Sequence, residues 1–288
     1  MSDVSVIGAG AMGSALVVAL AASGTEVTVW NRTPEKAAAL SGPRVRLAES
    51  AGEALLSSPL TIVSTSDHEV GRRLVEEADR DLDGRVVAST SFVTPEQAQA
   101  FRRVVGFAGG AYLDLEIIAY PGQVREGDGI FLFSGEHAAY EAHHDRFERI
   151  GRASHVSESP AAAYISGMAV LVAYFPLSVG LLQGLRIVES EGLSPDWFKE
   201  AVLDLYPFHI KTLLDRVIAQ SGTQTSDVEA SVDVMSAAAA EYGSALRDMG
   251  LDSGMYDALH RLFTAASEAG HGEDDWICVA EHVAAPSA

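Results

Sequence analysis

The sequence predicts an α/β protein with an N-terminal Rossmann domain, a long interdomain helix and an all-helical C-terminal domain. Three observations support this class. A glycine-rich turn follows the first apolar run, short β-branched runs then recur about 30 residues apart, and the pattern turns helical after residue 156. Strands that alternate with helical stretches predict βαβ units and a parallel sheet.

The N-terminal elements are expected in the following order. DVSVIG at residues 3–8 predicts a buried strand, and a helix follows from about Met12 to Ser23. EVTVW predicts a second strand, and Pro34 opens a second helix that reaches Leu40. Apolar runs rich in β-branched or aromatic residues predict further strands at TIVST, RVVAST, AYLDLEII and GIFLFSG.

The rest of the chain reads as helix. A long apolar helix is expected over about 159–191, and Ser194 with Pro195 marks the start of the next one. Two amphipathic helices are expected to end at Gly250 and Gly270, and GEDDWICVAEHV predicts a short last helix. The predicted domains are therefore 1–157 (Rossmann), 158–191 (interdomain helix) and 192–288 (helical, for dimerisation and substrate).

Composition excludes several classes of protein. The formal charge of −20 disfavours nucleic acid as a partner and requires any phosphate site to be locally basic. The single cysteine, Cys278, excludes an internal disulfide, and the first residues lack a basic n-region, so we expect a cytoplasmic protein. Residues 160–185 carry no charge, but the polar side chains among them and Pro176 favour burial between domains or subunits over a membrane span.

The first βα turn predicts a dinucleotide site. Gly8, Gly10 and Gly13 form G-x-G-x-x-G between a strand and a helix, where the turn, the approach of the pyrophosphate and the helix packing each need a glycine. Phosphate would bind at the helix N-terminus, beside Ala11 and Met12. Thr65, Ser66 and Ser91 follow the next strands and are also expected to contact the cofactor. We predict no metal site.

The end of the second strand selects the cofactor. NAD-binding proteins place Asp or Glu here for the ribose hydroxyls, whereas this chain has Asn31, Arg32 and Thr33, with Lys36 one turn further on. Asn removes the repulsion that a carboxylate would exert, and Arg offers a planar fork for phosphate oxygens. The sequence therefore predicts NADPH.

GAGAMGSAL, VWNRTPEKA, TPEQA, SDVEASVDVM and EAGHGEDDW together resemble the imine reductase family, within the β-hydroxyacid dehydrogenase superfamily. The resemblance covers nearly the whole chain. It implies a Rossmann domain, a long interdomain helix and a homodimer with shared active sites. It also implies reduction of C=N bonds, often of cyclic imines, by NADPH.

The chain departs from that family where the resemblance places the proton donor. Superfamily hydroxyacid dehydrogenases carry a Lys at the start of the long helix, and imine reductases place Asn or Asp there, or Asp or Tyr two turns later. A gapless count puts these positions on Gly167 and Phe175, and the loop before TPEQA holds Phe92. None of the three donates a proton. A shift of one residue would turn Tyr174 inward instead of Phe175.

An iminium ion suits a site without the usual acid, because it arrives protonated and its reduction builds no oxyanion. Four groups are candidates to assist: Tyr174, Glu116, Tyr120 and His209. Glu116 could pair with an iminium or point to solvent on an edge strand. An apolar substrate pocket is expected from Phe92, Gly167, Phe175, Tyr206 and Met235.

Two other functions remain open. One is a related reductase, either 3-hydroxyacid dehydrogenase-like or of the pyrroline carboxylate type, which would need a cationic anchor for its substrate's carboxylate. The other is a protein that binds NADPH as a sensor or partner subunit after its catalytic acid was lost. The absence of a donor at Gly167 and Phe175 is what favours the second.

Overall fold

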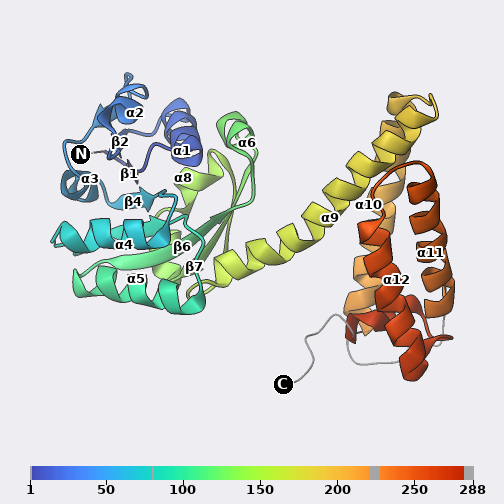
Figure 1. Cartoon of the computed structure of the whole chain (residues 1–288). Helices are drawn as coiled ribbons and strands as arrows, with labels where there is room; N and C mark the ends of the chain where they lie inside the picture. The colour runs from blue at the N-terminus through green and yellow to red at the C-terminus, as the bar shows by residue number, and fades with distance from the viewer. Residues whose placement is uncertain (1, 80, 221–227, 282–288) are drawn as a thin grey trace. The chain divides into compact units, whose positions relative to one another are not determined.

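The computed structural model describes residues 2–79, 81–220 and 228–281, which form two compact units, 1–175 and 176–288 (Figure 1). The strands are β1 (Val4–Ile7), β2 (Val27–Trp30), β3 (Val45–Leu47), β4 (Leu60–Val63), β5 (Val86–Ser89), β6 (Ala111–Ile117), β7 (Gly129–Gly135) and β8 (Gly151–Ser157). The helices of the first unit are α1 (Ala11–Ala22), α2 (Pro34–Ala38), α3 (Ala51–Ser57), α4 (His68–Glu77), α5 (Pro95–Phe107), α6 (Pro121–Glu126), α7 (His137–Glu141), α8 (His144–Glu148) and the first half of α9 (Ala162–Ser190).

The described strands form one sheet in the order β3-β2-β1-β4-β5-β6-β7-β8, which confirms the Rossmann class. Strands β1 to β6 are parallel, so their carboxyl ends meet at one edge. β7 instead runs antiparallel to β6, and β8 runs parallel to β7. The expectation of a purely parallel sheet was therefore wrong at β7. The connection from β6 holds only the short helix α6, whereas a parallel return needs a longer crossover.

Alternation along the strands divides the core between the two faces of the sheet. Val4 and Val6 pack with α1 and α6 on one face, while Ile7 packs with α3 and α5 on the other (Figure 1). In β6 the same alternation sends Leu113 and Leu115 to the first face. Asp114 and Glu116, which alternate with these leucines, therefore point to the second face.

Two hydrogen bonds hold the first turn of α9 against the sheet. The backbone N–H of Ala163 donates to Ser134 Oγ of β7 at 3.0 Å, and the N–H of Tyr164 donates to Asp114 Oδ2 of β6 at 3.2 Å. These N–H groups have no acceptor within the helix, so the sheet supplies the cap. The start of α9 is thereby fixed relative to β6.

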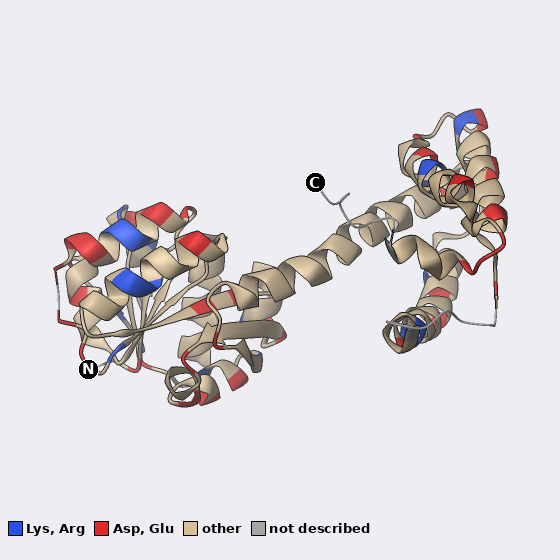
Figure 2. Ribbon diagram, turned by 90° about the horizontal axis from the view of Figure 1, so that it is seen from below, with Lys and Arg blue, Asp and Glu red and all other residues tan. Residues whose placement is uncertain are grey.

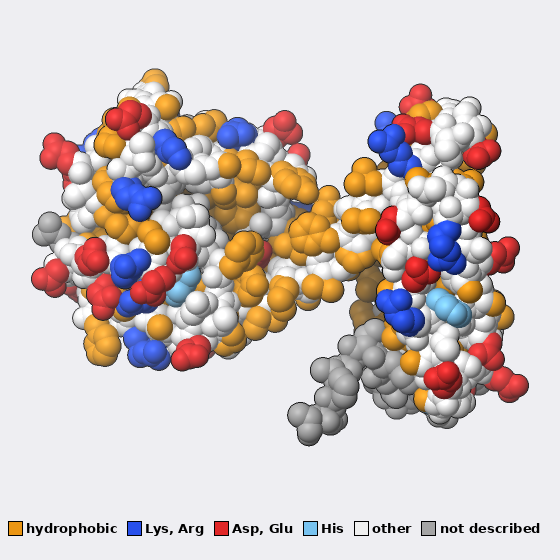
Figure 3. All heavy atoms as spheres, in the orientation of Figure 1, with side chains coloured by type: hydrophobic (Ala, Val, Ile, Leu, Met, Phe, Trp, Pro, Cys, Tyr) orange, Lys and Arg blue, Asp and Glu red, His pale blue; other side chains and the backbone are white. Residues whose placement is uncertain are grey.

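The rest of α9 carries exposed apolar side chains. Val170, Val172, Val179 and Leu182 are all more than half exposed, and no Lys, Arg, Asp or Glu lies between Ala162 and Leu185 (Figures 2 and 3). Among the described helices, α9 is long and apolar enough to cross a membrane. Length and composition alone support that statement, and helices buried in soluble proteins meet the same test.

The second unit contains the rest of α9, then α10 (Pro195–Gln220), α11 (Val232–Asp248), α12 (Gly254–Ala266), a π-helical turn (Ser267–His271) and a 3₁₀ helix (Trp276–Glu281). Ser194 accepts a hydrogen bond from the N–H of Trp197 and so caps α10, as expected. α11 begins at Val232, after its N-cap Ser231, whose hydroxyl accepts the N–H of Val234. Buried Asp275 joins the segments of this unit, because it pairs with Arg216 at 2.9 Å and accepts the N–H of Glu229 at 2.9 Å.

Candidate active site

The glycine-rich turn lies at the carboxyl edge of the sheet, between β1 and α1. Gly8 has φ +109°, and a Cβ there would lie 2.8 Å from the carbonyl carbon of Ser64. A Cβ at Gly13 would collide with the carbonyl group of Gly8. Gly10 differs, because no described atom lies within 4 Å of the place where its Cβ would be. The fold therefore needs Gly8 and Gly13, while Gly10 leaves open space at the helix N-terminus, the place where Rossmann domains bind a pyrophosphate.

Asn31 connects the loops around the adenosine end of this edge. Its Oδ1 accepts the N–H of Ala9 at 2.9 Å, and its Nδ2 donates to the carbonyl oxygen of Thr33 at 2.9 Å. Arg32, Thr33 and Lys36 are exposed beside it. All four line a cavity of about 430 Å³ that also includes Gly8 and Gly10. The residues predicted to bind the extra phosphate thus lie together with the phosphate cradle.

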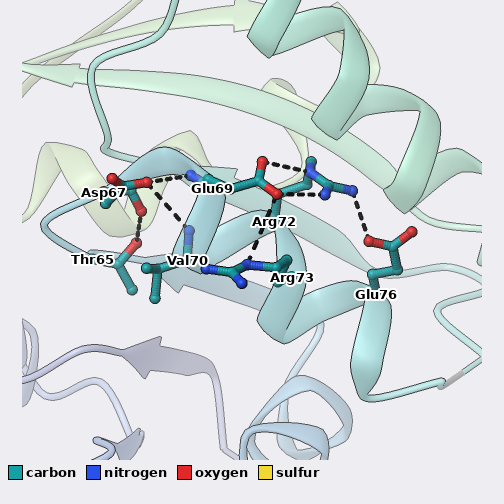
Figure 4. A network of polar contacts seen from close by, with 7 residues as sticks. All are labelled: Thr65, Asp67, Glu69, Val70, Arg72, Arg73 and Glu76. Carbon is teal, nitrogen blue, oxygen red and sulfur yellow. Dashed lines mark hydrogen bonds and ion pairs between the residues drawn. The ribbon is translucent and has the colours of Figure 1, made fainter.

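Sequence reasoning missed one cation of this cavity, Arg73 of α4. Its neighbour Arg72 donates to both oxygens of Glu69 at 2.9 and 2.6 Å and to Glu76 at 2.7 Å, whereas Arg73 lies 3.8 Å from Glu69 (Figure 4). Glu69 is thus engaged mainly by Arg72. The signal was available, because α4 follows β4 and β4 lies next to β1, but the Arg-Arg pair reads as solvated surface. Glu77 also lines the cavity and opposes an anion there.

Polar residues after β4 and β5 continue this edge. Ser91 is buried, and its hydroxyl donates to the carbonyl oxygen of Thr65 at 3.1 Å. The Thr65 hydroxyl donates to the carbonyl oxygen of Asp67, whose side chain caps α4 (Figure 4). Thr65 and Ser66 line the cavity beside Gly8 and Gly10. Of the other predicted cofactor contacts, Ala11 is exposed and Met12 half-buried at the start of α1.

Glu116 lies near the carboxyl end of β6, at the same edge. β6 is flanked by β5 and β7, so the alternative of a solvent-facing carboxylate on an edge strand was wrong. Glu116 is 6% exposed and Asp114 is 1% exposed, on the same face of the strand. Burial, reinforced by the charge of Asp114, raises the pKa of Glu116 to about 7. Burial raises the pKa of Asp114 to about 6 against the effect of the Tyr164 N–H.

The side chain of Glu116 occupies the space above Gly167 of α9. A Cβ at Gly167 would lie 2.9 Å from both the carboxyl carbon and Oε1 of Glu116. One turn earlier in α9, the Tyr164 ring meets the exposed ring of Phe92 edge-on at 5.7 Å. Two turns later, the Tyr174 hydroxyl is hydrogen-bonded to that of Tyr120, which raises the pKa of Tyr120. The structure therefore brings Glu116, Gly167, Phe92, Tyr120 and Tyr174 to the first half of α9.

The remaining predicted residues divide between the units. Phe175 is 58% exposed and its ring lies 5.9 Å from that of Tyr174. In the second unit, His209 is exposed with its ring against Phe208, Tyr206 is half-buried in α10, and Met235 packs against the core of α11 and α12. The roles of His209, Tyr206 and Met235 stay predictions.

Known proteins resemble both parts of the chain. The NAD-binding domain of 6-phosphogluconate dehydrogenase matches residues 3–163, and the C-terminal domain of NADPH-dependent reductive aminase-like proteins matches residues 159–285. An imine reductase structure from Pseudomonas sp. is 30% identical and superposes with a TM-score of 0.89 over 98% of this chain and 99% of that one. An imine reductase from Myxococcus stipitatus in complex with NADP+ is 28% identical, with a TM-score of 0.86 over 98% of this chain and 100% of that one.

A sequence relative with a described activity is the NADPH-dependent reductive aminase of Aspergillus oryzae, which is 24% identical over 65% of this chain. The aligned stretch spans 64% of that relative's own length, just under two thirds. Family models account for both the nucleotide-binding and the helical part, and the Pseudomonas structure aligns end to end. The chain therefore belongs to the imine reductase family, with an NAD-binding domain followed by a reductive aminase-like C-terminal domain.

Proposed function

We propose that this protein is an NADPH-dependent imine reductase that reduces the C=N bonds of cyclic imines or iminium ions to amines. One observation carries the choice of cofactor. Arg32, Lys36 and Arg73 surround the cavity, and β2, which ends beside it, is followed by Asn31 rather than by a carboxylate. In a chain of net charge −20, three cations around one cavity fit the 2′-phosphate of NADPH. Membership of the imine reductase family supports the reaction.

We assign separate tasks to residues along the carboxyl edge of the sheet. NADPH, when bound, supplies a hydride to the carbon of the C=N bond. Gly10 and the N-terminus of α1 would hold its pyrophosphate, and Arg32 with Arg73 its 2′-phosphate. The dinucleotide site runs from β1 across β4 and β5, so Thr65, Ser66 and Ser91 would face its nicotinamide half. Exposed Phe92 would help to shield the reacting bond from water.

The alternatives fit the site less well. Two buried carboxyl groups lie at this edge, Glu116 and Asp114, and in their ionised forms they would repel the carboxylate of a pyrroline acid or hydroxyacid. A protein that only binds NADPH as a sensor is disfavoured, because Glu116 provides a titratable group next to Gly167, where α9 itself has no side chain.

The partner we propose is a second copy of this chain. Between Met168 and Leu185, α9 carries no charged residue and exposes apolar side chains such as Val170, Val172, Val179 and Leu182, as expected of an interface rather than of a monomer surface. The resemblance to the imine reductase family implies the same homodimer. We propose that each copy contributes to the other's substrate pocket, with Tyr206 and Met235 among the contributors.

Two measurements test this function. Arg32→Ala should weaken NADPH binding about 10- to 100-fold, since it removes a charge-assisted contact, and leave NADH binding nearly unchanged. Arg103→Ala, an exposed arginine of α5, serves as the matched control. Equal affinity of the wild type for the two cofactors would contradict the cofactor choice.

The reaction is tested by following NADPH oxidation with cyclic imines, 3-hydroxyacids with NADP+ and a pyrroline carboxylate. We expect turnover of the uncharged imines and none of the two acids. Tight NADPH binding without turnover of any imine would favour the sensor, and preference for an acid would favour a related dehydrogenase or reductase.

A further inference from the structure

A buried carboxyl group at the reacting edge of a Rossmann sheet needs a reason. Burying an ionisable group without a partner is costly. Among the described residues, Glu116 has no hydrogen-bond donor and no ion-pair partner, and its nearest charged neighbour is another carboxyl group, Asp114. The burial of Asp114 is explained by the hydrogen bond that its carboxylate accepts from the N–H of Tyr164. Nothing in the packing of β6 explains Glu116.

The helix opposite Glu116 is adapted to it. Gly167 lies inside α9, where glycine costs about 1 kcal/mol relative to alanine. Even the Cβ of an alanine would lie 2.9 Å from the Glu116 carboxyl carbon, so the observed position of the Glu116 side chain requires glycine at residue 167. The hydrogen bonds of Ser134 and Asp114 to the first turn of α9 keep Gly167 above Glu116.

We propose that Glu116 is the catalytic acid and cation-binding residue of this enzyme, supplied by the sheet into the space that Gly167 leaves open on the helix. This assignment rests on the proposed function, an imine reductase. At Gly167 the helix offers no side chain, and the neighbouring strand β6 provides a carboxyl group at the same place. Tyr174 lies two turns further along α9 and is hydrogen-bonded to Tyr120, the N-cap of α6.

The chemistry balances with one proton from Glu116 and one hydride from NADPH. With a neutral imine, the hydride forms the new C–H bond, the C=N π pair moves to nitrogen, and nitrogen takes the proton of the Glu116 carboxyl group. The products are a secondary amine, NADP+ and the Glu116 carboxylate. The carboxylate then takes up a proton from the solvent and returns to its acid form. With an iminium ion no proton is needed, and the carboxylate pairs with the cation before reduction.

The surroundings of Glu116 suit both tasks. Asp114 lies on the same strand face, Leu132 pairs with Glu116 from β7, and α9 has no charged residue from Ala162 to Leu185. Burial and Asp114 raise the pKa of Glu116 to about 7, so both protonation states are available near neutral pH. The substrate class that follows is an uncharged, basic imine without a carboxylate, because a second anion would be repelled.

The first test compares Glu116→Gln with Glu126→Gln, an exposed glutamate of α6. On a neutral cyclic imine, Glu116→Gln should lower kcat/KM about 100-fold or more, the range of a lost general acid. On the N-methyl iminium salt of the same ring, the loss should be about 10-fold or less, because only the charge pairing is removed. Glu126→Gln should match the wild type on both, and circular dichroism verifies the fold. A Glu116→Gln variant within about threefold of the wild type on the neutral imine would overturn the proposal.

A second readout works without turnover. Calorimetry measures binding of a cyclic ammonium ion, the product-like cation pyrrolidinium, to the protein saturated with NADP+. Glu116→Gln should weaken this binding about 10-fold or more, and Glu126→Gln should not. If the wild type reduces no imine but Glu116→Gln still binds pyrrolidinium more weakly than the wild type, the proposed function fails and the cation site stands. Unchanged binding in Glu116→Gln removes the cation site whatever the activity.

Discussion

The glycines at residues 8, 10 and 13 separate a structural need from a functional one. Gly13→Ala places a methyl group against the Gly8 carbonyl and should destabilise the fold by about 2 kcal/mol or more. Gly10→Ala meets no described atom and is the N-cap of α1, so its midpoint of thermal unfolding should stay within about 2 °C of the wild type.

The same Gly10→Ala variant should lose about 10-fold or more in NADPH affinity, because the methyl group enters the space reserved for the pyrophosphate. Differential scanning fluorimetry with and without NADPH measures both quantities. If Gly10→Ala unfolds early, or if it binds NADPH as the wild type does, then Gly10 is not the residue that admits the phosphates.

The two buried carboxyl groups also predict how stability depends on pH. The pKa of Glu116 rises from 4.5 to about 7 on folding and that of Asp114 from 3.8 to about 6. The folded state therefore binds more protons than the unfolded state in this interval. Their contribution to the free energy of unfolding is complete below pH 4 and is lost as pH rises through about 6 and 7, by a few kcal/mol in total.

Urea unfolding at pH 5.5 and pH 8 measures this effect. Between pH 5.5 and pH 8 the wild type should lose about 2 kcal/mol more stability than Glu116→Gln, because only the wild type deprotonates Glu116 over this interval. Asp114, His68 and His143 titrate in both proteins, so their contributions cancel in the comparison. Glu126→Gln controls for the change in net charge. A pH dependence equal in wild type and Glu116→Gln would show that Glu116 titrates normally.

At the scale of single elements, the link between α9 and the sheet carries a separate prediction. Ser134→Ala leaves the N–H of Ala163 buried without an acceptor and should cost about 1–3 kcal/mol of unfolding free energy. The hydroxyl of Ser157, at the end of β8, accepts the N–H of Ser159 in an exposed turn, so Ser157→Ala should cost less than about 1 kcal/mol. Chemical denaturation of both variants checks the difference, and equal costs would mean that the anchor of α9 lies elsewhere.

The elements that the sequence predicts well are those with a strong local signal. β1, β2, β4, β5, β6 and β7 are rich in apolar and β-branched or aromatic residues, and α9 has a long apolar run, so their places were confirmed within a few residues. β3 has three residues and β8 alternates on the outer edge of the sheet, so neither produced a clear run. The antiparallel β7 depends on the shortness of α6, and the apolar pattern does not encode strand direction.

The site followed the same division. The phosphate cradle and its basic neighbours are local in sequence, and the structure brings them to one cavity. Arg73 belongs to another βα unit, and its proximity is a consequence of strand order. The relation of Glu116 to Gly167 joins residues 51 positions apart in the sequence, and only the packing of α9 on β6 reveals it.

At the scale of the whole molecule, the charge-free surface of α9 predicts the state of assembly. Val172→Glu combined with Val179→Glu places two carboxylates among apolar side chains that are each more than half exposed. Burial of such charges at an interface is costly, whereas exposure on a monomer is not. The wild type should elute with twice the 30.4 kDa chain mass and the double variant with the single mass, as light scattering would measure.

Phe107→Glu, at an apolar residue of α5 that is 90% exposed, is the matched control and should remain dimeric. The monomeric variant should keep NADPH binding within about threefold, because the cofactor cavity is built within residues 7–77, and lose imine turnover if the pocket is shared. A double variant that stays dimeric would place the interface elsewhere. A fully active monomer would show that one copy completes its own active site.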